Sequence, residues 1–308
     1  MMKHFFLFFA LILATTTIFS ETVDEYLNIG ERYFSEGRFH EARTAVESAI
    51  RLNPNYARAY FHLGVICYHL NDGILALDYL SRAIDLDNSL AEAYAWRAVI
   101  YEETMNDHAK ALRDHDMAVY LEPGNDRHLI NRAYFLYTVL EDFTQALTGY
   151  NRAIEINPLN YENFQQRGVC YAYQGLYEQA LNDFNEAINL NSKDVKNFTS
   201  RGATLFRMER HEEAMEDFDT AVRLDSNNFL GYFDRGFANI LLGRYNEAVL
   251  DFTEVIRINP RYRNAYFNRS VAYKYLASLS TNNQVQALHY LQKAAEDEAT
   301  VAMLDRQN

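Results

Sequence analysis

Nine histidines and two cysteines are the residues of this 308-residue chain best suited to metal ligation or nucleophilic chemistry. Two histidine pairs have a spacing compatible with one helix face, His62 with His69 and His108 with His115. Neither pair has carboxylate or thiolate partners in a metal motif such as HExxH, and two cysteines cannot form a zinc cluster. We therefore expect no metal site and no cofactor.

The sequence shows no arrangement typical of an enzyme. It contains no GxSxG motif, no glycine-rich phosphate loop and no nucleophile beside a recognisable base. Its formal net charge of −13 argues against binding nucleic acid or anionic lipid headgroups, both of which require a basic face. We expect a protein that is not an enzyme and does not bind nucleic acid.

Charged residues recur along the chain at intervals of 34 or 35 residues. The recurring arginines are Arg97, Arg132, Arg167, Arg201, Arg235 and Arg269. The recurring aspartates are Asp114, Asp183, Asp217 and Asp251. Because donors and acceptors recur together, we expect a structural ladder in which each guanidinium reaches an aspartate of its own or the preceding repeat. The alternative is an arginine stripe that binds an anionic ligand.

A small residue follows each of these arginines and extends the same period over most of the chain. The small residues are Gly30, Gly64, Ala98, Ala133, Gly168, Gly202, Gly236 and Ser270. A period of this length indicates a stack of helical hairpins rather than one globular core. The four prolines, Pro54, Pro123, Pro158 and Pro260, share one position of the repeat and mark the breaks between repeats.

The pattern resembles the tetratricopeptide repeat. In the first repeat Tyr26, Gly30, Tyr33, Ala42 and Pro54 match the family's positions. The resemblance implies an all-α, right-handed α-solenoid of about eight helix-turn-helix repeats, or about 16 helices. The repeats are expected near 23–56, 57–90, 91–125, 126–160, 161–194, 195–228, 229–262 and 263–295. The last repeat has an insertion around 278–283. We expect one long helix from Gln284 to about Asp305, whose mostly polar end within 296–308 caps the stack.

The resemblance also implies a concave groove lined by the first helices of the repeats. Its positions lie three residues before the small residue and one, four and five residues after it. They hold mostly aromatic and apolar residues, most strongly near the C-terminus. The expected groove residues are Phe61, Tyr68, Tyr134, Tyr137, Tyr173, Phe206, Phe233, Phe237, Ile240, Leu241, Phe267 and Tyr275. The Lys and Asn clamp that some family members use for acidic peptide C-termini is absent.

The first 20 residues have the layout of a secretory signal peptide. Lys3 precedes an apolar run over 5–14, and smaller, more polar residues follow as far as Ser20. The run is short for a bilayer span. We expect a leader over 1–20, export to the periplasm or the extracellular space, and no membrane span in the mature chain over 21–308. The alternative is an N-terminal membrane anchor.

These observations predict a non-enzymatic scaffold that binds a protein or peptide in an aromatic groove, because contiguous exposed apolar surface usually marks a partner site. The alternative is a carrier or sensor of a hydrophobic small ligand, including one that serves a transporter. Cys67 and Cys170 lie in predicted first helices three repeats apart. We expect both to be buried and too far apart for a disulfide.

Overall fold

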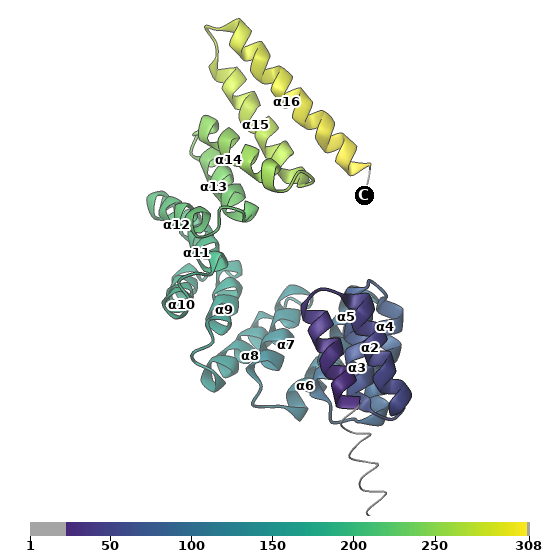
Figure 1. Cartoon of the computed structure of the whole chain (residues 1–308). Coiled ribbons are helices and arrows are strands. Elements are labelled where there is room, and N and C mark those ends of the chain that lie inside the picture. Colours follow the sequence, from purple (N-terminus) through teal and green to yellow (C-terminus); the bar gives the residue numbers. More distant parts are fainter. Residues whose placement is uncertain (1–22, 307–308) are drawn as a thin grey trace, which may run out of the picture. The chain divides into compact units, whose positions relative to one another are not determined.

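Each sequence repeat forms a hairpin of two antiparallel helices, so the predicted all-α fold is confirmed (Figure 1). The structure, a computed structural model, describes residues 23–306. The expected leader over 1–20 lies outside the described residues. The first helix covers 23–35. The others are α2 (Phe39–Leu52), α3 (Ala57–His69), α4 (Gly73–Leu86), α5 (Ala91–Glu103), α6 (His108–Leu121), α7 (Asp126–Thr138), α8 (Phe143–Ile156), α9 (Tyr161–Tyr173), α10 (Tyr177–Leu190), α11 (Val195–Arg207), α12 (His211–Leu224), α13 (Phe229–Leu241), α14 (Tyr245–Ile258), α15 (Arg263–Leu279) and α16 (Gln284–Asp305).

The chain divides into two compact units, which we describe separately. The N-terminal unit extends to Ile156 and contains the hairpins up to α8. The C-terminal unit begins at Asn157 and contains the hairpins from α9 to α16. In both units the two helices of a hairpin pack along each other, and the second helix also packs on the next hairpin.

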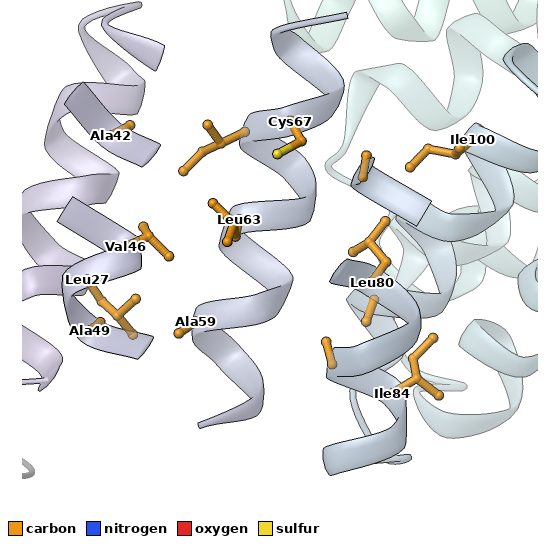
Figure 2. Packing of buried hydrophobic residues seen from close by; sticks show 14 of the residues in the cluster. Leu27, Ala42, Val46, Ala49, Ala59, Leu63, Cys67, Leu80, Ile84 and Ile100 are labelled. Carbon is orange, nitrogen blue, oxygen red and sulfur yellow. The ribbon is translucent and has the colours of Figure 1, made fainter. Parts of the chain in front are cut away.

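The recurring small residue lies where the two helices of a hairpin approach most closely. A Cβ atom added to Gly64 would lie 2.7 Å from Cγ of Leu80, and one added to Gly168 would lie 2.8 Å from Cε1 of Phe184. Leu63, Cys67 and Leu80 of this packing appear in Figure 2. The small residue therefore makes room for a bulky residue of the second helix, as close packing requires.

The short turn inside a hairpin needs a left-handed backbone conformation in both units. Gly37, Gly175 and Gly243 adopt it with φ of 74°, 77° and 73°. Asn71 and Glu209 hold the equivalent turns of two other repeats at φ of 61°. Glycine is favoured at this position because it has no Cβ to clash there.

Both cysteines are fully buried and free, as expected for small core residues. Cys67 lies in α3 and Cys170 in α9. Burial raises the pKa of the Cys67 thiol to about 11, and it also raises the pKa of Cys170. Both thiols therefore stay protonated at neutral pH and are poor nucleophiles.

The last helix has the expected length, because α16 runs from Gln284 to Asp305, but its late polar residues are not all exposed. Asp297 points inward and is only 4% exposed, whereas Val285 and Leu288 are 81% and 68% exposed. The solvent-facing side of α16 is therefore partly apolar, and the buried Asp297 lies on the side that packs within the hairpin.

Candidate binding surfaces on the first helices

Arginines of the first helices form bidentate ion pairs with buried aspartates of the second helices. Arg201 shows the geometry: Nε donates to Oδ2 of Asp217 at 2.8 Å, and Nη2 donates to Oδ1 at 2.7 Å. Among residues 23–306, five such pairs occur within hairpins, namely Arg97–Asp114, Arg167–Asp183, Arg201–Asp217, Arg235–Asp251 and Arg269–Asp297. Bidentate pairing of this kind combines charge with a fixed geometry.

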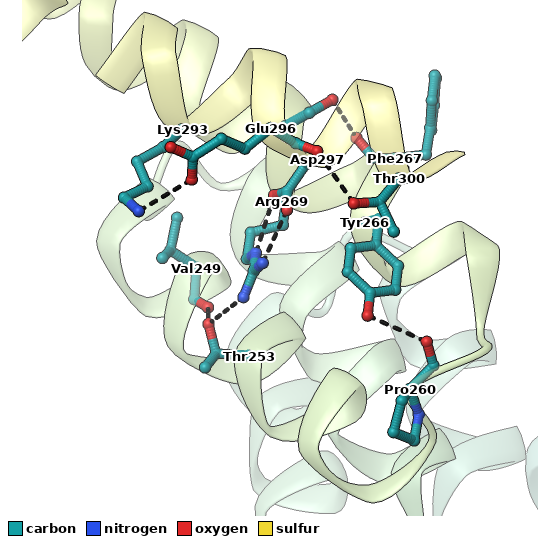
Figure 3. Close-up of polar contacts among 11 residues, drawn as sticks. Val249, Thr253, Pro260, Tyr266, Phe267, Arg269, Lys293, Glu296, Asp297 and Thr300 are labelled. Atoms are coloured by element: carbon teal, nitrogen blue, oxygen red, sulfur yellow. Dashed lines mark hydrogen bonds and ion pairs between the residues drawn. The ribbon is translucent and has the colours of Figure 1, made fainter. Parts of the chain in front are cut away.

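The third nitrogen of the guanidinium reaches the preceding hairpin. Nη1 of Arg201 donates to Asn185 at 2.7 Å, and Nη1 of Arg235 donates to Asp219 at the same distance. Arg269 contacts Thr253 in the same way at 3.0 Å (Figure 3). Each of these arginines therefore links three helices. With its donors already engaged, it is poorly placed to form the anion-binding stripe that we considered as the alternative.

Burial of these pairs has an electrostatic consequence. It raises the pKa of Asp183 and Asp251, and the hydrogen bonds from Arg167 and Arg235 oppose that rise. The aspartates are therefore held as anions by their arginines rather than by water, which makes each carboxylate dependent on its partner.

Arg132 departs from this geometry. Gly149 stands where four other repeats have Asp114, Asp183, Asp217 and Asp251, so α8 offers Arg132 no carboxylate there. Its Nε instead donates to Asp116 of the preceding hairpin at 2.5 Å, and its Nη2 donates to Gln145 at 3.3 Å. The loss of one aspartate thus redirects the arginine to the preceding repeat.

The partner of Arg269 was not among the aspartates expected from the sequence. Arg269 donates to Asp297 of α16, with bonds of 2.9 and 2.7 Å (Figure 3). α15 has 17 residues, whereas α13 has 13. In an antiparallel hairpin, residues added after Arg269 must be matched by residues added before its partner. The facing residue therefore comes later in α16.

The aromatic and apolar residues predicted for the groove fall into two groups. Half-buried members are Phe61, Tyr68, Tyr137, Phe206, Phe233 and Ile240. Exposed members are Tyr134, Tyr173, Phe237, Leu241, Phe267 and Tyr275. The half-buried ones fill space between helices. For example, the ring of Phe233 packs 5.7 Å from that of Phe252 and 5.2 Å from that of Tyr262.

Exposed apolar side chains gather on two neighbouring first helices of the C-terminal unit. Phe237 is 46% and Leu241 57% exposed on α13, and Phe267 is 49% exposed on α15. Tyr275 of α15 is also exposed and stacks on Tyr245 with ring centres 4.7 Å apart. α13 and α15 contact each other, and we call the exposed apolar residues of these two helices the α13–α15 surface.

Asp234, next to Phe233 on α13, was not singled out by its residue type or spacing. Burial raises the pKa of its carboxyl to about 6. No charged side chain in the described part of the chain offsets this effect. Asp234 is half-buried, and it places a titratable group on the same helix as part of the exposed apolar surface.

Replacing Asp234 with asparagine is expected to stabilise the protein by about 2 kcal/mol near neutral pH. The folded pKa lies above the unfolded value of about 4, so the wild type binds its proton more tightly when folded. Wild-type stability should therefore rise as the pH falls from above 6 towards 4. The gain from the Asp234→Asn substitution should shrink over the same interval. Denaturant titrations of both proteins across this range measure the difference, and parallel pH profiles would contradict the assignment.

Two hollows in the N-terminal unit meet at Trp96, the single tryptophan of the sequence. The first has a volume of about 270 Å³ and is lined mainly by apolar side chains, including Phe34, Phe61 and Val65. The second, of about 400 Å³, is lined by Tyr68 and by polar and apolar residues of α5 and α7. Sequence reasoning missed Trp96 because it lies two residues before the small residue Ala98, whereas the nearest expected groove position lies three residues before it.

The histidine pairs serve packing and one local polar contact. Nε2 of His62 lies 3.3 Å from Glu31, whereas the ring of His69 stacks on Phe39 at 5.2 Å. His115 is buried, packs 5.3 Å from Phe135, and has a pKa lowered to about 4 by burial. Within residues 23–306, no three His, Cys, Asp or Glu side chains are grouped to hold a metal ion. None of the helices in this range is both long and apolar enough to cross a bilayer.

Comparison with known proteins agrees with this architecture. Models of the tetratricopeptide repeat match residues 27–91 and also 161–194, 196–228 and 231–262. The mouse protein named Tetratricopeptide repeat protein 16 is 30% identical over 113 residues, which span 35% of this chain and only 15% of the mouse protein.

Two solved structures show the same fold. A tetratricopeptide repeat protein from Parabacteroides merdae has a TM-score of 0.66 at 19% identity, covering 82% of this chain and 99% of that one. PilW, described as a type IV pilus biogenesis factor, has a TM-score of 0.59 at 17% identity, covering 67% of this chain and 94% of its own.

Proposed function

This chain belongs to the tetratricopeptide repeat family, and from that premise we propose that it is a non-enzymatic scaffold that binds a partner protein or peptide. The observation that carries the proposal is the α13–α15 surface. Phe237, Leu241, Phe267 and Tyr275 are large apolar side chains that stay about half exposed on adjacent helices. A soluble protein that keeps such residues in contact with water generally uses them to bind.

The position of the surface on first helices favours a polypeptide ligand. α13 and α15 are held by the arginine ladder, with Arg235 and Arg269 each bonded across the hairpin. A surface on helices fixed in this way is organised before binding, so less free energy is lost in ordering it. Exposed aromatics on rigid helices are typical anchors for a partner's apolar side chains.

Replacing Phe237 with glutamate is expected to weaken partner binding at least about tenfold, because it puts a charge in the centre of the apolar surface. The fold should survive, since Phe237 is 46% exposed. The measurement is quantitative affinity capture from the source organism followed by mass spectrometry. The matched control is Leu224→Glu at the end of the second helix α12, where the side chain is 38% exposed.

Proteins retained by the wild type and by the Leu224→Glu variant, but lost by the Phe237→Glu variant, are the expected partners of the α13–α15 surface. If the Phe237→Glu variant retains every partner at wild-type levels, the α13–α15 surface is not the binding site. Circular dichroism of the three proteins separates loss of binding from loss of fold.

The second candidate function, carriage or sensing of a hydrophobic small ligand, is supported by the apolar hollow beside Trp96. Its volume of about 270 Å³ is below the roughly 300–1,000 Å³ of typical small-ligand pockets, which favours the scaffold. Native mass spectrometry of protein purified from its source distinguishes the two, because a lipid that stays bound would support the carrier.

The proposed site of action is outside the cytoplasm, in the periplasm or the extracellular space. The support is the order of residues at the N-terminus, with Lys3 before an apolar run and polar residues up to Ser20. Expression of the full chain in a bacterial host, followed by intact-mass measurement, tests this. Loss of residues 1–20 supports export, and retention of these residues in the membrane fraction supports the anchored alternative.

A further inference from the structure

The first-helix faces of the two units carry opposite charge. In the N-terminal unit the groove positions of the repeats, defined above relative to the small residue, include Glu31, Glu102 and Glu103 but no Lys or Arg. In the C-terminal unit the same repeat positions include Arg207 and Lys274 but no Asp or Glu, and Lys274 pairs with Glu298 of α16. The two faces are therefore suited to different partners, although they derive from one repeat pattern.

In the N-terminal unit the acidic residues adjoin the apolar hollow. Phe34, Phe61, Val65 and Trp96 line this hollow of about 270 Å³, and the carboxylate of Glu31 lies on the same lining. The aromatic walls are fixed by their neighbours. The ring of Phe34 packs 5.4 Å from that of Phe39, and this pair packs in turn around His69.

The second hollow continues this surface on the other side of Trp96. Its lining adds the exposed carboxylate of Glu92 and the ring of Tyr68, whose hydroxyl donates to Glu103. Arg127 and His128 also line this hollow, and Arg127 is the arginine among its lining residues. Acidic groups thus border the apolar floor on both sides of the tryptophan.

The charge of Glu31 is not offset by the histidine beside it, whereas Arg127 lines the same hollow as Glu92. Burial lowers the pKa of His62, so the imidazole facing Glu31 is neutral at pH 7. Burial and the neighbouring carboxylate of Glu103 raise the pKa of Glu102, which shows that negative charge is crowded at this end of α5. Arg58 also acts on His62 but does not line the hollow. A cationic side chain brought to this surface would relieve the repulsion.

We propose that the surface around Trp96 binds a segment of a partner protein in which a bulky apolar side chain is flanked by Lys or Arg. The apolar side chain enters the hollow between Phe34, Phe61 and Trp96. The basic side chains lie against Glu31 and Glu92. This inference rests on the proposed scaffold function but concerns a different surface from α13–α15.

The size of the hollow favours a side chain over a free small molecule. At about 270 Å³ it is smaller than most pockets that enclose drug-sized ligands, yet a single aromatic or aliphatic side chain fits within it. Buried aromatic anchors supply most of the binding free energy in such contacts. Charges at the rim contribute mainly to selectivity and association rate, and their contribution weakens as salt is added.

Trp96 provides the measurement, because it is the chain's single tryptophan and lines both hollows. Its fluorescence is followed during titration of the full-length protein with three synthetic peptides without Trp or Tyr. The first has Phe and Leu among lysines, the second has glutamates in place of the lysines, and the third has serines in place of Phe and Leu. Only the first peptide is expected to shift the emission and saturate.

The double variant Glu31→Gln/Glu92→Gln is expected to weaken binding of the lysine peptide by about threefold to tenfold, since two exposed rim charges are lost. The double variant Asp78→Asn/Asp85→Asn removes the same charge from exposed positions of α4 that line neither hollow. It should bind as the wild type does. Both double variants change surface residues, so the fold should be retained.

Equal binding of the lysine and glutamate peptides, or no response to any peptide, would overturn this inference. Either outcome would leave the α13–α15 proposal intact if the Phe237→Glu variant still loses its partners. Conversely, saturable binding of the lysine peptide by the Phe237→Glu variant would support the Trp96 surface independently of α13–α15.

Discussion

Replacing Asp217 with alanine is expected to lower the free energy of unfolding by about 3 kcal/mol. Asp217 is 4% exposed and accepts two hydrogen bonds from Arg201, which is itself largely shielded from water. Removing the carboxylate leaves a guanidinium partly buried without its counter-ion, a situation that costs much more than the loss of a surface pair.

The ladder contains its own control. Asp219, two residues further along α12, also pairs with an arginine, at 2.7 Å from Nη1 of Arg235, but its side chain is 63% exposed. The Asp219→Ala substitution should cost less than about 1 kcal/mol, because exposed pairs contribute little. If both alanine variants lowered the free energy of unfolding by the same amount, burial would not determine how much an arginine–aspartate pair stabilises the protein.

The measurement for these variants must resolve individual repeats. Stacked repeats need not unfold as one cooperative unit, so a single denaturation midpoint can hide a local change. Denaturant titration should therefore be combined with hydrogen exchange. The Asp217→Ala variant is expected to lose protection in α11 and α12 before it loses protection in α15 and α16.

Replacing Gly202 with leucine is expected to cost about 3 kcal/mol, at the upper end of the range for overpacking. An added Cβ alone would lie 2.8 Å from Cε1 of Phe218 and 3.2 Å from the carbonyl oxygen of Ala214. The backbone oxygen cannot move without disturbing α12, so the two helices must separate. Thermal unfolding followed by circular dichroism measures the loss.

Gly124→Leu is the matched control, because a Cβ added to Gly124 meets no atom within 4 Å. This variant should unfold close to the wild-type temperature. An unchanged melting temperature for the Gly202→Leu variant would contradict the assignment of the recurring small residue to the helix contact.

Much of the fold could be predicted because the determining interactions are close in sequence. The two helices of a hairpin lie within one 34- or 35-residue period, so the pairing of Arg201 with Asp217 repeats with nearly the same separation. Small residues facing bulky ones, as Gly168 faces Phe184, follow the same rule. Repetition along the chain makes these contacts visible without coordinates.

Departures from the period needed the structure. The longer α15 moves the partner of Arg269 to Asp297, and Gly149 redirects Arg132 to Asp116. Both changes depend on how an insertion or a missing side chain is accommodated when helices pack. A spacing rule cannot say whether a displaced residue still faces its partner.

The sequence by itself determined the repeat length, the helical hairpin, the recurrence of arginines with aspartates and the aromatic character of the first helices, because each depends on periodic residue types. Only the tertiary structure decided which aromatics stay exposed, as at Phe237, and which fill the interior, as at Phe233. It alone brought Phe34, Phe61 and Trp96 of three successive repeats around one hollow. The physical reason is that the exposure of a side chain and the shape of a hollow depend on how neighbouring repeats pack together. The residue type at one position of the repeat carries no information on that packing.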